Sequence, residues 1–207
     1  MEEIGIFSVN NKMIKTVRKD YDKKYTNQFI EIMKNNFAKD DPIVELGSGV
    51  GSKLFVLAKN GFTNLKGFEL THQGVVIANN YAKKKNYSIE FEQLDMTKSL
   101  PKKDLENKVI FTYAVLEQLK NYMKKILLNI ISVNPRKIIN FEVNYDESSF
   151  LTKMYLNSVD YQNNLMKNLK KLERNEKIKI ISKEKLNIQY SPVNQLSSII
   201  WKPIKIK

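Results

Sequence analysis

A cluster of glycines beside an acidic residue is the part of this sequence whose residue types and spacing could most directly do chemistry. Three of the seven glycines lie at positions 47, 49 and 51. An apolar run that contains Glu45 precedes them, and a run of helical spacing follows. Glycine lets the backbone approach a ligand closely, and the start of a helix offers unpaired N–H groups. The segment therefore predicts a nucleotide-type binding site.

The spacing of these glycines separates the candidate ligands. A dinucleotide-binding turn has the pattern G-x-G-x-x-G, whereas residues 47–51 read G-S-G-V-G. Residues 45–51 instead resemble the first motif of class I S-adenosylmethionine (SAM) methyltransferases, acid-x-G-x-G-x-G. In that family the glycine turn packs against the methionine part of SAM. The resemblance implies a Rossmann-like α/β fold, with a seven-stranded, mostly parallel sheet, helices on both faces and the last strand antiparallel.

Two further acids, Glu69 and Asp95, follow the next two predicted strands. Ligands of open α/β sheets bind beyond the carboxyl ends of the strands, and an ionised carboxylate can accept hydrogen bonds from both hydroxyls of a ribose. The methyltransferase family uses the second-strand acid for the SAM ribose and the third-strand acid for the adenine amino group. NAD is the less favoured ligand, because it would use an acid at position 69 but not one at position 95.

The resemblance implies a set of SAM contacts along the first four strands and the preceding helix, in which Tyr21 is an alternative to Tyr25. The expected cofactor-binding residues are Glu45, Gly47, Ser48, Gly49, Gly51, Glu69, Leu70, Asp95, Met96, Tyr113 and Tyr25.

The fourth predicted strand bears on the methyl acceptor. Residues 112–118, T-Y-A-V-L-E-Q, lack the Asn/Asp-Pro-Pro-aromatic motif of enzymes that methylate amino groups of DNA bases. The chain has no cysteine, which excludes pyrimidine carbon-5 methylation, because that reaction needs a cysteine nucleophile, and arsenite methylation, because those enzymes also depend on cysteines. Residues 113–118 resemble the x-x-L-E-H segment of small-molecule methyltransferases, with Gln118 in the place of the usual histidine. A histidine base is therefore not expected at this position.

An aligned nucleophile is the main requirement for transfer from an activated sulfonium, and a hydroxyl acceptor also needs a general base. Glu117 and Glu142 are the candidate bases because both follow strands near the expected methyl group. A carboxylate acceptor would need no base. Asp160 and Asn164 are four residues apart and would share a helix face. The expected substrate-binding residues are Glu117, Glu142, Asn144, Tyr145, Tyr155, Asp160, Tyr161 and Asn164.

Two other interpretations of this region stay open. The polar residues after position 144 could simply be the solvent-facing side of an amphipathic helix. A weaker resemblance, over residues 141–145, 160–164 and 198–203, is to uncharacterised methyltransferases found among bacterial biosynthetic genes. That resemblance names no acceptor.

Alternating strands and helices must position these residues, and they predict a largely parallel sheet covered on both faces. The expected strands are 43–46, 65–70, 89–95, 109–113, 137–142, 178–182 and 198–204, and the expected helices are 11–40, 53–60, 73–85, 122–133 and 148–174. We expect one domain over residues 1–207. It divides into a helical N-terminal cover (1–40), a SAM-binding core (41–145), and a substrate-side helix with C-terminal antiparallel strands (146–207).

Composition favours a cytoplasmic enzyme. The 207 residues include 42% apolar residues, which is ordinary for a globular protein. The absence of cysteine excludes disulfides and thiolate metal sites and fits a reducing compartment. The acidic start does not resemble a signal peptide, and no run of 18 apolar residues occurs. Neither a membrane partner nor a metal is expected, and no feature points to an oligomeric state.

The net charge of +13 suggests nucleic acid as a partner, but nearly all of the basic residues are lysines, which disfavours that interpretation. Only Arg18, Arg136 and Arg174 are arginines, whereas phosphate and base recognition favours the planar arginine fork. Lysine, asparagine and isoleucine share A/T-rich codons, so base composition accounts for much of the charge. We expect a polar small-molecule substrate, methylated at oxygen. The alternatives are an RNA or protein methyltransferase, and a catalytically idle SAM-fold protein that binds a partner.

Overall fold

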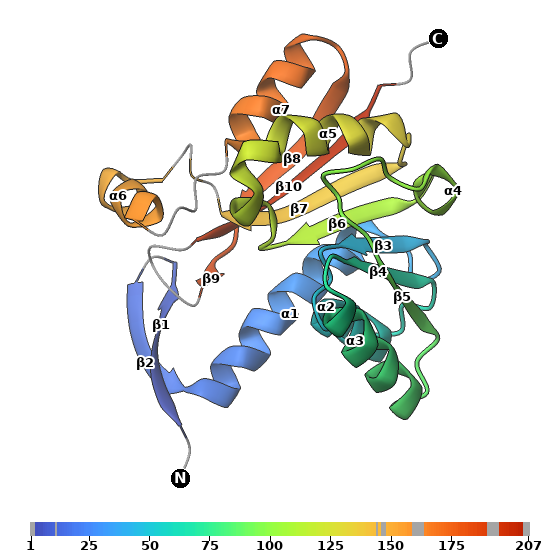
Figure 1. Cartoon of the computed structure of the whole chain (residues 1–207). Helices are drawn as coiled ribbons and strands as arrows, with labels where there is room; N and C mark the ends of the chain where they lie inside the picture. The colour runs from blue at the N-terminus through green and yellow to red at the C-terminus, as the bar shows by residue number, and fades with distance from the viewer. Residues whose placement is uncertain are drawn as a thin grey trace.

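A seven-stranded sheet forms the centre of the computed structural model, which describes residues 3–10, 12–143, 145, 148–158, 164–189 and 195–204 (Figure 1). The strand order is β5-β4-β3-β6-β7-β10-β8. Strands β3 to β7 are parallel, and β10 is antiparallel to both of its neighbours. The strands are β3 (Ile43–Leu46), β4 (Leu65–Glu69), β5 (Ile89–Gln93), β6 (Val109–Tyr113), β7 (Lys137–Val143), β8 (Ile178–Lys185) and β10 (Leu196–Pro203). The predicted Rossmann-like methyltransferase fold is confirmed.

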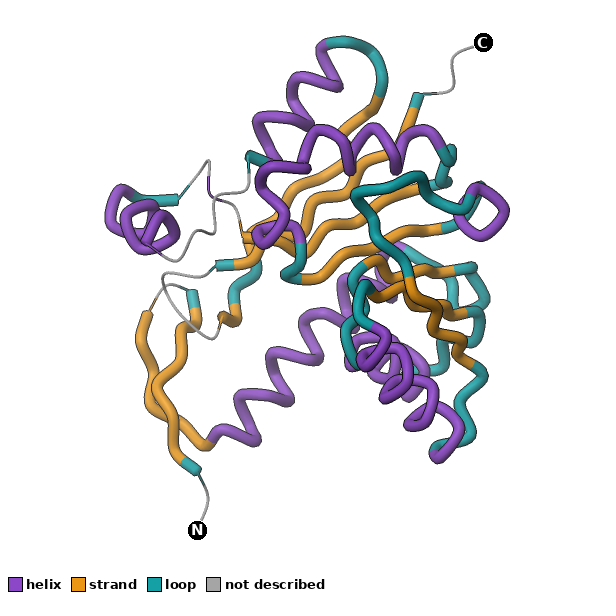
Figure 2. The backbone as a smooth tube through the Cα atoms, viewed as in Figure 1, coloured by secondary structure: helices purple, strands orange, loops and turns teal. Residues whose placement is uncertain are grey.

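Helices cover both faces of this sheet because its central strands are apolar on both sides. Helices α1 (Arg18–Asn36), α2 (Ser52–Lys59) and α3 (His72–Lys84) pack on one face, where Phe29 and Leu54 join the core. Helices α5 (Met123–Ser132) and α7 (Leu165–Arg174) pack on the other face, and Figure 2 shows the two helical layers. The shorter helices are α4 (Lys102–Leu105), η1 (Leu116–Tyr122) and α6 (Phe150–Ser158). Within the described ranges, none of the helices has the length and apolar character needed to cross a bilayer.

The N-terminal region differs from the predicted helix over 11–40. Strands β1 (Ile4–Val9) and β2 (Lys12–Val17) form an antiparallel hairpin, and β9 (Ile188–Gln189) pairs with β1, so helix α1 begins only at Arg18. The β-branched side chains of residues 14, 16 and 17 favour a strand. The predicted helix over 148–174 is likewise two helices, α6 and α7.

Tyr21 ties this hairpin to the rest of the molecule. Its ring stacks on Phe7 with centroids 3.9 Å apart, and its hydroxyl donates to the carbonyl oxygens of Ser8, at 3.1 Å, and Gln189. The side chain is fully buried, which raises the pKa of Tyr21 to about 12. Tyr21 therefore has a structural part at the junction of α1, β1 and β9.

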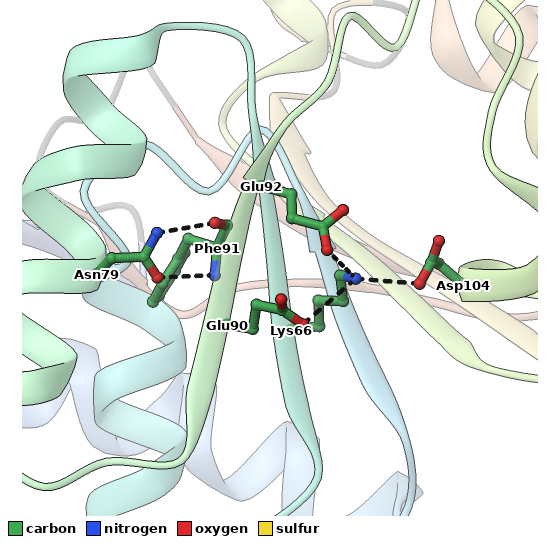
Figure 3. A network of polar contacts seen from close by, with 6 residues as sticks. All are labelled: Lys66, Asn79, Glu90, Phe91, Glu92 and Asp104. Carbon is green, nitrogen blue, oxygen red and sulfur yellow. Dashed lines mark hydrogen bonds and ion pairs between the residues drawn. The ribbon is translucent and has the colours of Figure 1, made fainter.

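A polar network fixes the edge strand β5 (Figure 3). Lys66 on β4 lies 2.6 Å from Glu92 on β5 and 3.0 Å from Asp104 on α4. The side chain of Asn79 on α3 forms hydrogen bonds with the backbone N–H and carbonyl of Phe91. These contacts hold β5 between α3 and β4, next to the glycine turn.

Candidate functional site

A cavity of about 580 Å³ lies beyond the carboxyl ends of β3, β4, β5 and β6. Its volume falls within the range of about 300–1,000 Å³ typical of small-molecule sites. It is lined by Gly47, Gly49, Glu69, Leu70, Thr71, Leu94, Asp95, Met96, Thr97, Tyr113, Ala114, Val115, Gln118, Leu119 and Tyr122. The strand-end acids Glu69 and Asp95 thus meet the glycine turn at one cavity.

The glycine turn connects β3 to α2 with a backbone that few other residues adopt. Gly49 has φ of 54° and Gly51 has φ of 83°. A Cβ on Gly51 would lie 2.5 Å from the ring of Phe91, whereas a Cβ on Gly49 would meet nothing within 4 Å. Gly49 therefore leaves open space where a ligand can approach the backbone, and Gly51 lets α2 start against the sheet.

The carboxylate of Glu69 is held within its own loop. Its Oε2 accepts a hydrogen bond of 2.9 Å from the Gly49 N–H. Its Oε1 accepts from the N–H of Thr71 at 3.0 Å and from the Thr71 hydroxyl at 2.9 Å. Thr71 also caps α3, since its hydroxyl oxygen accepts from the Gly74 N–H. The carboxylate is fixed at the cavity wall with acceptor capacity for ribose hydroxyls.

Asp95 is held in the same manner after β5. Its Oδ1 accepts from the Thr97 hydroxyl at 2.6 Å and from the Thr97 N–H at 2.9 Å. These hydrogen bonds lower the pKa of Asp95. Thr71 and Thr97 were not among the predicted contacts, although each stands two residues after a strand-end acid. That repeated spacing is a signal from which both could have been found.

Burial shifts the pKa of two residues that flank the glycine turn in sequence, Glu45 and Lys53. Glu45 on β3 is 2% exposed, and its burial raises its pKa well above the ordinary value, against the effect of Lys53. Burial also lowers the pKa of Lys53, against the effect of Glu45. The Lys53 ammonium lies 3.9 Å from the ring centroid of Tyr113 and 5.3 Å from that of Tyr25, a cation–π arrangement.

The cavity fits SAM on two observations, the two strand-end acids in its wall and the open backbone at Gly49. Behind the turn, two buried oxygens, Ser48 Oγ and Glu45 Oε2, have no hydrogen-bond partner in the described structure. Of the predicted cofactor residues, those that line the cavity are Gly47, Gly49, Glu69, Leu70, Asp95, Met96 and Tyr113.

Tyr25 lies behind the cavity wall. Its hydroxyl accepts a hydrogen bond of 2.6 Å from the hydroxyl of Tyr113, which does line the cavity. Burial raises the pKa of Tyr25. Tyr25 is therefore linked to the cavity by its hydrogen bond with Tyr113.

Glu117 and Glu142, the two predicted bases, lie side by side beneath the turn that follows β6. The Glu142 carboxyl accepts from the N–H groups of Val115, at 3.4 Å, and Leu116, at 3.1 Å. Burial raises the pKa of Glu142 well above its ordinary value, and the charge of Glu117 and a hydrogen bond to it act in the same direction. Burial and the neighbouring carboxyl group thus both favour the protonated form of Glu142. Neither side chain lines the cavity.

Three of the other predicted substrate residues, Tyr145, Tyr155 and Asn164, are not among the residues that line the cavity. The Tyr145 hydroxyl donates to Asn157 at 2.8 Å, Tyr155 is 44% exposed on α6, and Asn164 is exposed at the start of α7. Asn144, Asp160 and Tyr161 lie outside the described residues. Besides Thr71 and Thr97, the wall residues that the sequence did not predict are Leu94, Ala114, Val115, Gln118, Leu119 and Tyr122. The last five come from the turn after β6 and from η1.

Comparison with protein families agrees with this geometry. A family model described as a methyltransferase domain matches residues 37–190, which include the whole glycine turn and both strand-end acids. No protein with curated annotation matches the chain.

Solved structures share the fold at low sequence identity. The PH0226 protein of Pyrococcus horikoshii OT3 has a TM-score of 0.68 and 14% identity, over 88% of this chain and 91% of that one. The magnesium protoporphyrin IX methyltransferase ChlM of Synechocystis PCC 6803, with bound S-adenosylhomocysteine (SAH), has a TM-score of 0.67 and 13% identity, over 89% of this chain and 84% of that one. An S-adenosylmethionine-dependent methyltransferase of Clostridium acetobutylicum ATCC 824 has a TM-score of 0.64 and 12% identity, over 87% of this chain and 91% of that one.

Proposed function

The chain belongs to the family of methyltransferase domains and uses SAM, and from that premise we propose that it methylates a polar small molecule at an oxygen atom. One observation supports SAM as the cofactor: Glu69, Asp95 and the open backbone at Gly49 line the same cavity. In this arrangement Glu69 would hold the ribose hydroxyls and Asp95 the adenine amino group. The turn from Gly47 to Gly51 would lie against the methionine part.

SAM supplies a methyl group already activated on a sulfonium sulfur. The protein has to align the acceptor with the carbon–sulfur bond and exclude water. Tyr113, Ala114 and Val115 line the cavity at the end of β6, and the Val115 N–H donates to Glu142 of the buried carboxyl pair. An acceptor bound against this wall would lie on the side of the cavity that faces the pair.

Oxygen as the methylated atom is supported by the Glu117–Glu142 pair. A hydroxyl acceptor must lose its proton, and a buried carboxyl pair beside the wall offers a general base. A polar small acceptor is supported by the moderate cavity volume of about 580 Å³. The name of the Synechocystis neighbour specifies a small-molecule acceptor for that protein, which is compatible with this substrate class.

Titration calorimetry with SAM, SAH and NADH tests the cofactor assignment. We expect SAM and SAH to bind the wild-type protein, and the Glu69→Ala variant to lose at least about tenfold in affinity, about 1.4 kcal/mol. Glu31→Ala is the matched control, because Glu31 is an exposed glutamate on α1. Binding of NADH alone would contradict the proposal.

An acceptor screen with methyl-labelled SAM tests the reaction. Alcohols, phenols, carboxylic acids and amines form the panel, and label transfer to a hydroxyl oxygen is the expected result. Glu117→Gln and Glu142→Gln test the base. Full activity in both single variants would remove the carboxyl pair from the mechanism, and transfer only to amines would contradict methylation at oxygen.

A further inference from the structure

A second cavity, of about 370 Å³, lies at the opposite end of the sheet from the cofactor cavity at the glycine turn. Its wall comes from the turns just before β6 and β7, the start of β8 and the end of β10. Strand β10 is antiparallel to β7, so its last residues lie beside the first residues of β7. Because β7 has seven residues, about 20 Å separate this end of the sheet from the carboxyl end of that strand. We call this the basic cavity, and it is lined by Asn107, Asn134, Pro135, Arg136, Lys179, Lys202, Pro203 and Ile204.

Three cations line the basic cavity, whereas none of the described residues in its wall is acidic. The cations are Arg136, Lys179 and Lys202. Arg136 is fixed by Asp41, whose Oδ1 atom lies 2.7 Å from the arginine Nη2, and its backbone N–H donates to the Lys108 carbonyl at 2.8 Å. Neither lining lysine forms an ion pair with a described residue. Three positive groups and one carboxylate leave this region with a net charge of +2.

The two lysines of the wall stand directly opposite each other. Lys179 on β8 pairs with Lys202 on β10 in the antiparallel ladder, so both side chains lie on one face of the sheet. The Cβ atoms of such partners are about 4.5–5.5 Å apart, and like charges in this position destabilise the pairing. An anion bound between the two ammonium groups would neutralise both and replace the repulsion by attraction.

Amide groups complete the wall on the side of the parallel strands. Asn107 and Asn134 adopt positive φ angles of 57° and 49°. The Asn107 N–H donates to the Asn134 carbonyl at 3.1 Å, which holds the two turns side by side. Each side-chain amide offers two N–H donors. The basic cavity therefore combines a guanidinium, two ammonium groups and two amides, all of which can donate hydrogen bonds to oxygen atoms.

The charge and the donors favour a phosphate monoester over other anions. Such a group carries a charge of about −1.5 to −2 at neutral pH and has three acceptor oxygens, whereas a carboxylate, a sulfonate or a phosphodiester is singly charged. A dianion matches the net charge of +2, and the N–H donors that Arg136 does not direct at Asp41 suit phosphate oxygens. Pro135, Pro203 and Ile204 add an apolar surface against which the organic part of a monoester can lie.

We propose that the basic cavity binds a phosphate monoester with a small apolar body, at a ligand site separate from the cofactor cavity. The phosphoryl oxygens lie between Arg136, Lys179 and Lys202, and the apolar body lies against Pro135 and Ile204. Binding is non-covalent and leaves the monoester unchanged. The site goes beyond the proposed methyl transfer, because it uses no residue of the glycine turn and lies about 20 Å from the carboxyl end of β7.

Titration calorimetry with phenyl phosphate tests this site. We expect phenyl phosphate to bind the wild-type protein, and the double variant Lys179→Gln/Lys202→Gln to lose at least about tenfold in affinity, because two charged donors are removed. Lys185→Gln is the matched control, since Lys185 is an exposed lysine on β8 outside the basic cavity. No binding to the wild-type protein, or equal affinity in the double variant, would overturn the proposal.

Two further ligands test the chemical class. Benzenesulfonate has a similar shape but a single charge, and it should bind more weakly than phenyl phosphate. Equal affinity for the two would show that the site does not select a monoester. A short oligouridine supplies singly charged phosphodiesters, and tighter binding of it than of phenyl phosphate, lost in the double variant, would assign the basic cavity to nucleic acid instead.

Urea unfolding gives a readout that separates binding from folding. Lys179→Gln should raise the urea midpoint of the unliganded protein, because the repulsion by Lys202 is removed. Phenyl phosphate should raise the midpoint of the wild type but not that of Lys179→Gln. Lys185→Gln, opposite the neutral Ser197, should behave as the wild type in both respects. A lower midpoint in unliganded Lys179→Gln would show that the lysine pair stabilises the fold and would contradict the proposal.

SAH binding distinguishes this site from the proposed function. We expect the double variant to bind SAH as the wild type does, and SAH and phenyl phosphate to bind at the same time. Displacement of phenyl phosphate by SAH would place the probe in the cofactor cavity and overturn the proposal. A wild-type protein that binds phenyl phosphate but not SAH would refute the proposed function and leave the second site standing.

Discussion

The side-chain amide of Asn79 pairs with both backbone polar groups of Phe91, donating to its carbonyl at 2.8 Å and accepting from its N–H at 3.1 Å (Figure 3). Through this pair α3 holds the edge strand β5, and the Phe91 ring is kept against Gly51 and Gly67. A contact between one helix and one edge strand therefore supports the glycine turn from beneath.

Asn79→Ala should destabilise the protein by about 1–3 kcal/mol, since two hydrogen bonds of about 0.5–1.5 kcal/mol each are lost. Urea unfolding measures the change. Asn80→Ala, at the adjacent exposed position of α3, should stay within about 0.5 kcal/mol of the wild type. Equal effects in the two variants would show that the pairing with Phe91 contributes nothing.

The two glycines of the turn should respond differently to an added methyl group. Both have a left-handed backbone, which costs another residue about 1–2 kcal/mol. Gly51→Ala must also displace Phe91, so it should lose about 1–3 kcal/mol more stability. Gly49→Ala should fold well but bind SAH at least about tenfold more weakly. Urea unfolding measures the stability of both variants, and calorimetry measures their affinity for SAH. A larger loss of stability in Gly49→Ala than in Gly51→Ala would contradict the geometry.

Stability should fall as pH rises above the ordinary range of a glutamate. Burial raises the pKa of Glu45, so the folded state keeps a proton that the unfolded state has lost. The folded state then binds more protons, which makes the slope of unfolding free energy against pH negative. Glu45→Gln should flatten this slope at pH values above the ordinary pKa of a glutamate.

Exposed Glu31→Gln is the control for that experiment and should keep the wild-type slope. Urea midpoints across the pH series provide the measurement. A slope in Glu45→Gln that equals the wild-type slope would mean that Glu45 is ionised in the folded protein.

Asn140 links two buried partners across β6, β7 and β10. It accepts a hydrogen bond of 2.7 Å from the Trp201 indole and donates one of 2.9 Å to Thr112. Asn140→Ala leaves the indole N–H unpaired, at about 1–3 kcal/mol, and adds a small cavity. Fluorescence of Trp201, the single tryptophan, follows the unfolding. An unchanged midpoint would contradict this account, and exposed Asn35→Ala serves as the control.

The central part of the fold could be predicted because its signals are local. Strands β3 and β6 are short, mostly apolar runs, and the acids that line the cavity stand at the end of β4 and just after β5. The hairpin could not be predicted in this way. It owes its stability to Tyr21 and to β9, a strand of two residues far along the chain.

The walls of the candidate site were less predictable than its acids. Ala114 adopts a positive φ, which no feature of its sequence signals, and it is this turn that brings Val115 and Gln118 to the cavity. The meeting of Glu117 and Glu142 depends on the register of β6 and β7, in which Thr112 lies opposite Asn140. The sequence could therefore nominate both acids but could not predict that their side chains are in contact.

The position of β10 has a consequence for how the chain is synthesised. Residues 196–203 insert between β7 and β8 and pair with both. Until this last strand leaves the ribosome, β7 and β8 expose unpaired edges and the Trp201 indole has not reached Asn140. The parallel half of the sheet can form while translation continues, but the complete sheet can close only after residues 196–203 have emerged. A ribosome stalled before residue 196 would therefore carry a nascent chain prone to edge-to-edge association.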